Sequence, residues 1–366
     1  MSTVISPMYA WQDLRWQTIE RRVFKLQKRI YQASRRGQVK AMRKLQRLLM
    51  ASWSARGLAV RKVTQDNQGK KTPGVDGKAS LTPRERQHLV TDLRHLQRPA
   101  QPVRRVYLRK PNGEPRPLGI PTMHDRAMQA LVKLALEPEW EAKFEPNSYG
   151  FRPGRSCHDA LEAIFASTKY TPRYVLDADI KGCFDHINHA ALLAKLHTFP
   201  QLHRLMKGWL KAGIMEGEVC SPAEAGTPQG GVASPLLANI ALHGMEEAVT
   251  RVFPHRRRAE GNVVSWSNKP KLIRYADDRA PRRRGKEKGD LEASCCTRDG
   301  GRPSGAGVQD QASNHLQLRE LRASVVSVAG KGEPRARQVW VKQTNASEPL
   351  RTCRKRRDDV KTGASR

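Results

Sequence analysis

Two short apolar runs, each followed by aspartates, constrain the fold of this chain more than any other feature. The first extends from Tyr174 to Asp185 and the second from Leu272 to Asp278. Both have the length and apolar content of a buried strand. Neighbouring carboxylates repel each other unless a cation lies beside them. Two such strands side by side would place acids at one end of a sheet. There they can share the metal ions that two-metal phosphoryl and nucleotidyl transfer requires.

An Asp-Asp pair alone is common on protein surfaces, so the interpretation depends on further blocks. Three blocks stand in a fixed order: Asp179 followed by Phe184, Thr-Pro-Gln-Gly-Gly-Val-Ala-Ser-Pro-Leu-Leu-Ala-Asn at 227–239, and Tyr-Ala-Asp-Asp at 275–278. In this order they resemble the reverse transcriptases encoded by bacterial and organellar group II introns, with a match over residues 11–278. The resemblance implies an RNA-directed DNA polymerase (a nucleotidyltransferase) of maturase lineage, encoded by a mobile element, that copies RNA into cDNA.

The resemblance also implies the fold class and the division of the chain. We expect an α+β fold of the right-hand polymerase type, with fingers and a ferredoxin-like palm sheet. Residues 1–75 would form a basic helical N-terminal extension, 76–170 the fingers, and 171–285 an incomplete palm with the catalytic aspartates. Residues 286–366 would form a largely disordered basic tail without a family match, so that the thumb is missing.

The resemblance assigns the catalytic and metal-binding residues within this palm. It identifies Asp179, Asp277 and Asp278 as the catalytic acids. Asp179 and Asp277 would hold two Mg²⁺ ions, the Ile180 carbonyl would be a nearby ligand, and Asp278 would support the site. Ligands that are all oxygens suit magnesium. We read Asp185 as the cap of the helix that follows it.

A β-hairpin is predicted ahead of the palm. A strand-like run over 104–108 precedes a Pro-Asn-Gly turn at 111–113, and Lys110 and Arg116 flank that turn. Two cations near a hairpin tip can face a triphosphate, although surface cations commonly have no specific role. By the resemblance, Lys110 and Arg116 match the fingers residues that hold the phosphates of the incoming nucleotide.

Two further nucleotide-binding residues are implied by the resemblance. Phe184 would lie beneath the sugar, where its ring would clash with a 2′-hydroxyl and so favour deoxynucleotides. Gln229 would lie beside the sugar, in a flexible loop over 226–231. Without the resemblance, Pro-Gln-Gly-Gly reads as an ordinary loop at the start of a helix.

The N-terminal region is helical and basic. Apolar residues at three-four spacing predict a helix from Trp16 onward and a second over about 39–50, with Gly37 as the break and Leu48 on the inward face. The net charge of the chain, +32, indicates a polyanionic partner, and nucleic acid fits best. The basic helix faces are either solvated surfaces or phosphate contacts to structured RNA. The resemblance favours RNA contact, with group II intron RNA, an RNA template with a DNA primer, and dNTPs as partners.

Apolar spacing predicts three further helices. They extend over about 125–137, where Pro138 would end the helix, over 156–165 and over 234–249. Between the first two lies the segment 148–155, whose rings and arginines suit either a base stack or ordinary core packing.

The histidines and cysteines do not predict a zinc site. His186, His189 and His197 match no tight ligand set, and we expect ordinary histidines on helix surfaces. None of the six cysteines forms a Cys-x-x-Cys pair, which favours a reducing compartment. We found no signal-peptide core and no run of about 18 apolar residues. The expected location is therefore the bacterial cytoplasm, with an organelle as the alternative and no membrane partner.

The composition changes abruptly after Asp278. The run 279–285 cannot form a buried central strand, and residues 279–366 contain no Phe, Tyr, Ile or Met. The tail is either a natural basic arm that binds RNA or an out-of-frame translation after a frameshift, and we favour the frameshift. Reading the other two frames of the DNA would reveal a strand and a thumb if this hypothesis holds.

These observations leave three functions to weigh. The leading one is a group II intron reverse transcriptase whose processive synthesis is impaired, because neither a closing strand nor a thumb would support the site. The alternative is a non-catalytic RNA-binding factor for intron splicing. A reverse transcriptase of prokaryotic defence or diversification ranks third, since the N-terminal helices and the loop at 72–77 resemble the intron branch more closely.

Overall fold

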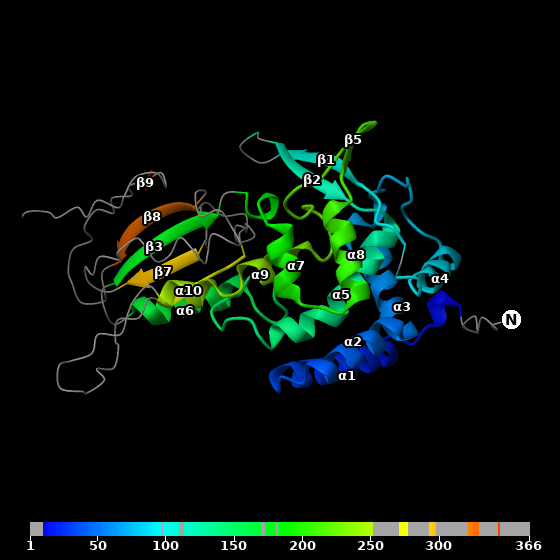
Figure 1. The fold of residues 1–366 in the computed structure, drawn as a ribbon, viewed down its shortest axis with the longest axis horizontal. Helices are drawn as coiled ribbons and strands as arrows, with labels where there is room; N and C mark the ends of the chain where they lie inside the picture. Colours follow the sequence, from blue (N-terminus) through cyan, green and yellow to red (C-terminus); the bar gives the residue numbers. More distant parts are fainter. Residues whose placement is uncertain are drawn as a thin grey trace, which may run out of the picture.

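The computed structural model describes residues 10–96, 98–109, 113, 115–169, 173–180, 182–251, 271–276, 293–297, 321–328 and 343–344. Figure 1 shows a mostly helical body joined to a separate twisted sheet, the mixed helix-and-sheet class that the sequence predicts. None of the described helices is long and apolar enough to cross a membrane.

The N-terminal helices match the predicted hairpin. After a short turn, η1 (Trp11–Asp13), the chain forms α1 (Trp16–Arg35) and α2 (Val39–Ala51), which are separated at Gly37 (φ +66°). The helix α3 (Trp53–Arg61) follows and runs into a π-helical turn, η2 (Lys62–Asp66), and a 3₁₀ turn, η3 (Gln68–Lys71). The helix α4 (Pro83–Asp92) begins at Thr82, whose hydroxyl and Glu85 form a capping box.

One side-chain prediction for α2 is wrong. Leu48 is 52% exposed, whereas Gln46 is fully buried and the Arg43 side chain points inward. The cause is a buried acid on the neighbouring helix. The Glu139 carboxylate has no exposed surface and accepts hydrogen bonds from Arg43 at 2.6 Å and from Gln46 at 2.8 Å. A buried charge needs such partners, so α2 is rotated to supply them.

The long helix α5 (Met123–Glu141) is the centre of the body and packs against α1, α2 and α3. It continues through Pro138, so the prediction that this proline ends the helix is wrong. Proline leaves the carbonyl four residues earlier without its helical donor. Here that carbonyl, of Leu134, accepts a hydrogen bond from the Gln27 side chain of α1 at 3.0 Å, which removes the cost of the lost donor.

The predicted β-hairpin is present. The strands β1 (Val103–Arg109) and β2 (Pro115–Ile120) pair antiparallel, with Arg109 opposite Pro115 at the turn. Two short strands, β4 (Ile214–Glu216) and β5 (Val219–Ser221), extend them into a four-stranded sheet of order β2-β1-β4-β5.

Five further helices are described, of which α6 (Cys157–Thr168) and α10 (Met245–Arg251) contact β6 (Lys271–Ile273) of a second sheet. The others are α7 (His189–Leu196), α8 (Pro200–Lys211) and α9 (Ser234–Leu242). The single helix predicted over 234–249 is therefore wrong. Gly244 adopts φ +94° and divides it into α9 and α10. One apolar cluster extends from Trp11 to α9, and a smaller one joins Tyr149, Ala160 and Ile273.

The second sheet has five strands in the order β6-β7-β3-β8-β9 (Figure 1). Its strands are β3 (Arg173–Ile180), β6 (Lys271–Ile273), β7 (Ala293–Thr297), β8 (Leu321–Val328) and β9 (Gln343–Thr344).

Three of these strands come from the tail, and this changes two expectations. The tail is not disordered at β7, β8 and β9, and β7 lies between β6 and β3, where no closing strand was expected. The physical reason is local composition. Alternating Val, Ser and Ala in 321–328, and small residues with two cysteines in 293–297, tolerate strand pairing, whereas the arginine run that motivated the prediction lies elsewhere in the sequence. The rest of 279–366 lies outside the described residues.

Candidate active site

The five-stranded sheet sets β3 and β6, which belong to the two aspartate-bearing runs, in the same direction. Both β3 and β6 pair antiparallel with β7, so they run parallel to each other. Ser294 of β7 faces Asp177 on one side and Ile273 on the other, which places those two residues in one row. Counting two residues further along each strand aligns Asp179 with Tyr275, and Asp277 comes two residues later in the sequence.

One strand separates β3 from β6, so the two strands lie about 9–10 Å apart by ordinary strand spacing. Acids at the ends of these strands would hold the metal ions that the sequence predicts. The donor set of Asp179, the Ile180 carbonyl, Asp277 and Asp278 consists of oxygens and therefore suits magnesium.

Only part of this predicted metal site falls within the described residues. The backbone of Asp179 and Ile180 is described in β3, whereas Asp277 and Asp278 lie outside the described residues. Among the residues that the structure describes, no group of three His, Cys, Asp or Glu side chains could hold a metal ion.

Immediately before Asp277, the backbone at Ala276 packs closely against the backbone at Gly150. Ala276 has φ +51°. A Cβ atom at Gly150 would lie 2.8 Å from the Ala276 Cα and closer still to its nitrogen, so only glycine fits. The neighbouring Tyr149 N–H donates to the Arg274 carbonyl at 2.8 Å, and the Arg274 N–H donates to the Asn147 carbonyl at 2.9 Å. The segment 147–150 therefore fixes the path of the chain immediately before Asp277.

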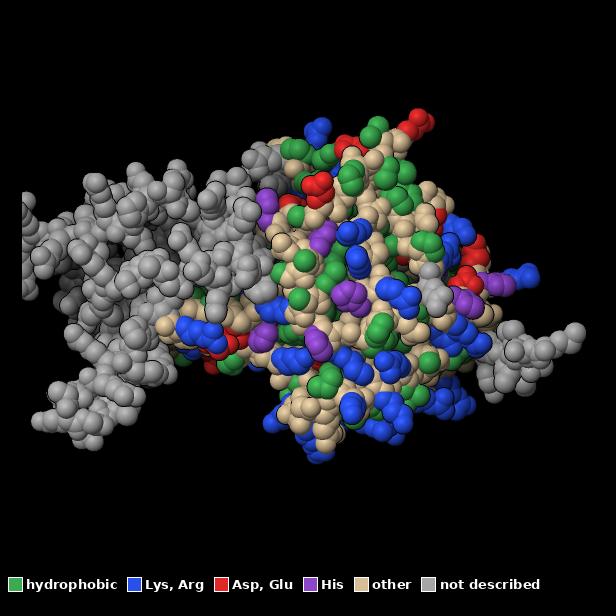
Figure 2. Space-filling view, in the orientation of Figure 1, with side chains coloured by type: hydrophobic (Ala, Val, Ile, Leu, Met, Phe, Trp, Pro, Cys, Tyr) green, Lys and Arg blue, Asp and Glu red, His purple; other side chains and the backbone are tan. Residues whose placement is uncertain are grey.

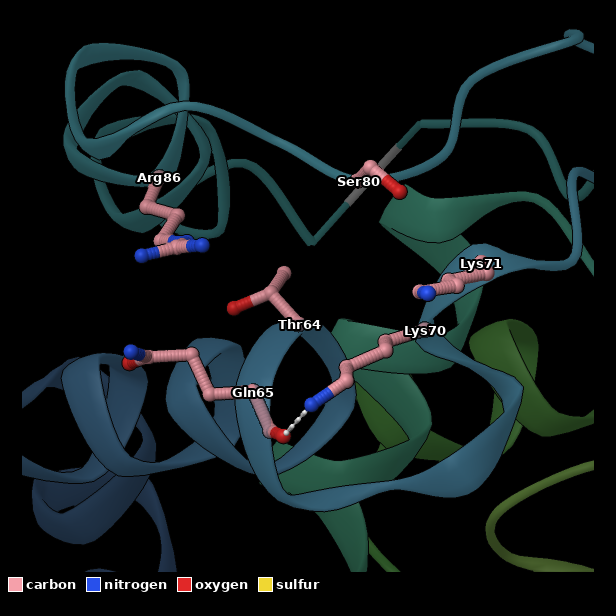
Figure 3. Close-up of a pocket in the computed structure, with 6 residues that line it drawn as sticks. All are labelled: Thr64, Gln65, Lys70, Lys71, Ser80 and Arg86. Atoms are coloured by element: carbon pink, nitrogen blue, oxygen red, sulfur yellow. Dashed lines mark hydrogen bonds between the residues drawn. The ribbon is translucent and has the colours of Figure 1, made fainter.

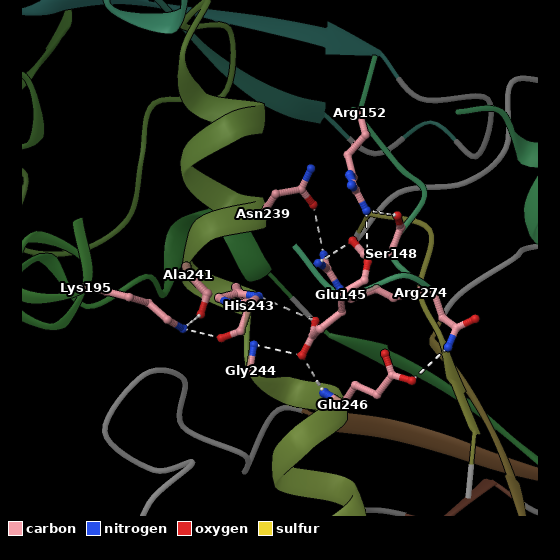
Figure 4. A network of polar contacts seen from close by, with 11 residues as sticks. Glu145, Ser148, Arg152, Lys195, Asn239, Ala241, His243, Gly244, Glu246 and Arg274 are labelled. Atoms are coloured by element: carbon pink, nitrogen blue, oxygen red, sulfur yellow. Dashed lines mark hydrogen bonds and ion pairs between the residues drawn. The ribbon is translucent and has the colours of Figure 1, made fainter. Parts of the chain in front are cut away.

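Arg274 anchors this junction from inside the protein (Figure 4). Its side chain is 1% exposed and donates to the Asn239 amide oxygen at 2.9 Å and to the Ser148 hydroxyl at 2.6 Å. Asn239 in turn donates to the Gly150 carbonyl at 2.8 Å. Burial of so large a cationic side chain requires these partners. Arg274 thereby ties β6 to α9 and to the glycine that contacts Ala276.

The turn after β3 presents Phe184. Gly182 adopts φ +63° and lets the chain turn into η4 (Cys183–Asp185), where the Phe184 ring is 6% exposed. The Phe184 ring packs edge-on against the ring of Phe151, with centroids 6.4 Å apart. In the segment 148–155, Tyr149 is buried whereas Phe151 is 42% exposed, so the two rings have different roles.

The loop at 226–231 closes over η4. The Thr227 N–H donates to the Phe184 carbonyl at 2.7 Å, and the Gly226 N–H donates to the Ile187 carbonyl at 2.9 Å. Gly226 has φ +85°, and a Cβ there would lie 2.7 Å from the Phe184 carbonyl oxygen. The loop is therefore fixed by backbone contacts, in contrast to the flexible loop that the sequence suggested.

Gln229 lies at the centre of a polar chain that connects three segments. Its amide oxygen accepts a hydrogen bond from Arg116 Nε at 3.1 Å, and its amide nitrogen lies 3.4 Å from both carboxylate oxygens of Asp185. Its carbonyl accepts from the Gly119 N–H of β2 at 2.7 Å. Three of the four predicted nucleotide-binding residues, Arg116, Phe184 and Gln229, thus gather around η4, and Lys110 lies outside the described residues.

Asp185 and His189 differ from their sequence interpretations. Asp185 does not cap α7. Asn188 does so, because its side chain accepts from the Ala191 N–H at 3.0 Å, while Asp185 faces Gln229. His189 is not on a helix surface. It is 9% exposed, and its Nε2 lies 2.6 Å from the Gly226 carbonyl. Neither contact has a sequence signal, because both depend on the loop that folds back from 226.

Lys195 binds the C-terminal end of α9 through its ammonium group. Its ammonium donates to the Ala241 carbonyl at 2.9 Å and to the His243 carbonyl, which lie at the C-terminal end of that helix (Figure 4). Burial lowers the pKa of Lys195 from 10.5 to about 8, and Arg274 adds to this lowering, while Glu145 opposes it.

The pKa of Lys195 predicts a pH-dependent stability. Between about pH 8 and its unfolded pKa, near 10.5, the unfolded chain binds more protons at this site than the folded chain. The free energy of unfolding should therefore rise with pH in that window, by up to about 1.4 kcal/mol per pH unit. Denaturant unfolding of wild type and Lys195→Met between pH 7 and 10.5 measures this. Above pH 8, the free energy of unfolding of the wild type should rise relative to that of the variant. Parallel curves would contradict the prediction.

Comparison with known proteins places this geometry in a class. Residues 11–93 match the N-terminal domain of reverse transcriptase, and residues 108–291 match reverse transcriptase (RNA-dependent DNA polymerase). The second match covers half of the chain, begins in β1 and continues past residue 278, where the sequence resemblance was expected to end. The class is thus that of reverse transcriptase domains.

Individual relatives specify the branch. The group II intron-encoded protein LtrA of Lactococcus lactis subsp. cremoris is 38% identical over 225 residues, which are 57% of this chain and 37% of LtrA. Protein YkfC of Escherichia coli is 34% identical over 265 residues, 64% of this chain and 70% of YkfC. Maturase-like protein 1 of Euglena gracilis is 31% identical over 247 residues, 64% of this chain and 52% of that protein. The chain belongs to the family of group II intron-encoded reverse transcriptases and maturases.

The chain spans 37% of the length of LtrA, so it corresponds to a part of that relative. Among solved structures, a chain of a partial Cas6-RT-Cas1–Cas2 complex is 20% identical with a TM-score of 0.37, covering 67% of this chain and 38% of that chain.

Proposed function

We propose that the chain is an RNA-directed DNA polymerase of a group II intron that adds deoxynucleotides to a primer on an RNA template. The observation that carries this proposal is the parallel arrangement of β3 and β6, the strands in the two aspartate runs. The family membership supports the same activity. The division into N-terminal extension, fingers, palm and tail is part of the proposal.

Each residue of the site has a proposed task. Arg116 and Lys110 neutralise the triphosphate of the incoming nucleotide. Phe184 restricts the space beneath the sugar, and Gln229 contacts that sugar from a position that Arg116 and Asp185 fix in advance. Preorganisation of this kind lowers the entropic cost of binding the nucleotide.

Asp179, Asp277 and Asp278 would hold two Mg²⁺ ions, with the Ile180 carbonyl beside them. When bound, such ions would lower the pKa of the attacking hydroxyl and stabilise the negative charge on the leaving group. The task of the protein is to hold the acids in register, and Arg274, Gly150 and the turn at Ala276 do this for the second run.

We further propose that processive synthesis is impaired. In the described part of the chain no helix follows α10, so nothing there resembles a clamp for the primer duplex. The strand β7 now supplies the support that a closing strand would give, and the impairment therefore concerns processivity more than the chemical step.

The exposed face of α1 is the proposed contact surface for intron RNA and template. Figure 2 shows Lys and Arg side chains gathered over α1 and α2. On α1, the exposed cations are Arg21, Arg22, Lys25, Lys28, Arg29 and Arg35. Phe24 stands among them with 65% of its surface exposed. An exposed ring among cations suits stacking with an unpaired base, while the cations contact phosphates.

This surface yields a prediction about Phe24. Phe24→Ala should weaken binding of RNA with unpaired loops about tenfold, because a base–aromatic stack is worth about 1–3 kcal/mol. Filter binding at fixed salt measures the effect. Leu48→Ala also removes an exposed apolar side chain, but from α2, and should leave the affinity for RNA unchanged. Equal effects of the two variants would contradict a specific stack.

A primer-extension assay on an RNA template tests the proposed function. We expect magnesium-dependent addition of deoxynucleotides that stops after short products. Full-length cDNA made by this chain would refute the impairment, and absence of even single additions would refute the polymerase activity.

The alternative function is a non-catalytic splicing factor that binds intron RNA through the basic N-terminal helices. Relatives named as maturases favour it. Under this alternative, wild type and Asp179→Ala bind RNA with equal affinity. The chain promotes splicing and adds no nucleotide to a primer.

A further inference from the structure

A cationic pocket lies in the N-terminal region, among side chains that have no task in the proposed active site (Figure 3). It has a volume of about 380 Å³. The residues that line it are Thr64, Gln65, Lys70, Lys71, Ser80 and Arg86. Three of these are cations and none is an acid. Such a lining attracts an anion.

The backbone around the pocket fixes one of its cations. The π-helical turn η2 is followed at once by η3, and the Lys70 ammonium donates to the Gln65 carbonyl at 2.9 Å. The Ser80 N–H donates to the Lys70 carbonyl at 3.1 Å. These contacts join both sides of the pocket and leave two of the three ammonium hydrogens of Lys70 for another acceptor.

Arg86 reaches the pocket from α4 and has no acidic partner among the described residues. Its Nε is buried without a hydrogen-bond partner there, and its guanidinium lies 6.0 Å from the Trp11 ring centroid. Figure 3 shows the guanidinium directed into the space between α4 and Gln65. Burial lowers the pKa of Arg86, which indicates a cation that lacks compensation. A buried donor without an acceptor is costly, and a bound anion would supply that acceptor.

The acids near the pocket are engaged elsewhere. The Asp66 carboxylate forms an ion pair with Arg61, with 3.7 Å between Asp66 Oδ1 and Arg61 Nε. The Glu85 carboxylate accepts hydrogen bonds from Thr82 at the start of α4. The Gln65 amide oxygen accepts from the Trp11 indole at 2.9 Å, so its amide nitrogen remains as a donor. The pocket therefore offers mainly donors.

We propose that this pocket binds a phosphate group of an RNA backbone. The assignment to RNA, as opposed to a free nucleotide, follows from the lining, which contains no aromatic or large apolar side chain to hold a base. A phosphodiester needs only charge and donors. The inference rests on the proposed binding of RNA, and adds an anchor at η2, η3 and α4 that is separate from the face of α1.

Lysine footprinting on the full chain tests the inference. The chain is acylated with and without saturating intron RNA, and modification at each lysine is followed by mass spectrometry. Lys70 and Lys71 should react at least about fivefold more slowly with RNA bound, whereas Lys78, exposed on the next loop and outside the pocket, should be unaffected. Parallel samples contain inorganic pyrophosphate or a nucleoside triphosphate instead of RNA.

Variants add a second readout. Lys71→Ala changes an exposed side chain, and should reduce the slope of log affinity against log salt by about 0.7–0.9 if one phosphate contact is lost. Arg86→Gln should do the same if its unfolding midpoint stays near that of wild type. Lys78→Ala is the matched control and should leave the slope unchanged.

The outcomes separate this inference from the proposed function. If the chain binds RNA while Lys70 and Lys71 stay fully reactive, the pocket assignment is overturned and the RNA surface is retained. If pyrophosphate or the nucleotide protects these lysines and RNA does not, the pocket is a small-anion site and the assignment to RNA is overturned. If the chain binds no RNA, the proposed function itself fails.

Discussion

Asp179→Ala and Asp277→Ala are each expected to abolish single-nucleotide addition by this chain. Both acids would hold the shared metal ions, and metal stabilisation of a phosphoryl-type transition state is worth several kcal/mol. At about 1.4 kcal/mol per tenfold, the expected loss is at least about 10³-fold. Single-turnover addition of one deoxynucleotide to a primer on an RNA template measures the chemical step without requiring processivity.

Controls separate chemistry from folding in this experiment. The same variants should bind intron RNA as wild type does, because α1 and α2 are remote in sequence from both acids. Asp177→Ala is a matched control on the same strand, and it should retain addition since the resemblance selects Asp179 as the ligand. Persistent addition by Asp277→Ala would show that the second aspartate run has no part in the reaction.

Arg274→Ala is expected to destabilise the fold by about 3 kcal/mol. The side chain is almost completely buried, and its loss leaves Asn239 and Ser148 without a donor, at about 1–3 kcal/mol for each buried unsatisfied group. The same change frees the chain before Ala276 from α9. We therefore expect addition to fall by about a hundredfold even where the protein remains folded, since a displacement of about 1 Å has that cost.

Urea unfolding and single-nucleotide addition on the same preparation check this prediction. Arg204→Ala, an exposed arginine on α8, is the matched control and should change neither quantity by a measurable amount. Arg274→Ala with wild-type stability would mean that the contacts of Arg274 do not support the site.

The sequence predicts those parts of the fold that local pattern determines. The three-four spacing of α1 predicts a helix and the run at 104–116 predicts a hairpin, and the structure contains both the helix and the antiparallel pairing of β1 with β2. The errors occur where a distant partner decides. Pro138 is tolerated because Gln27 satisfies the carbonyl of Leu134, and Leu48 is exposed because α2 turns Arg43 toward the buried Glu139. These partners are distant in the sequence, so local patterns cannot predict the contacts.

The same distinction applies to the site. The order of motifs identified Arg116, Phe184 and Gln229, and the structure brings them together around η4. It could not reveal the roles of Asp185 and His189, because their contacts to Gln229 and Gly226 arise when a loop forty residues later folds back. The burial of Arg274 was equally hidden, since an arginine beside Tyr-Ala-Asp-Asp gives no local indication of its partners on α9.

The central claim is that the acids of two distant runs meet over shared cations, and iron-directed cleavage tests it most directly. Fe²⁺ replaces Mg²⁺ in the folded chain, and ascorbate with peroxide generates radicals that cut the backbone near the bound ion. We predict cuts near both Asp179 and Asp277, competed by Mg²⁺ and lost together in Asp179→Asn. Cleavage at one run alone, or unchanged cleavage at Asp277 in Asp179→Asn, would contradict the account.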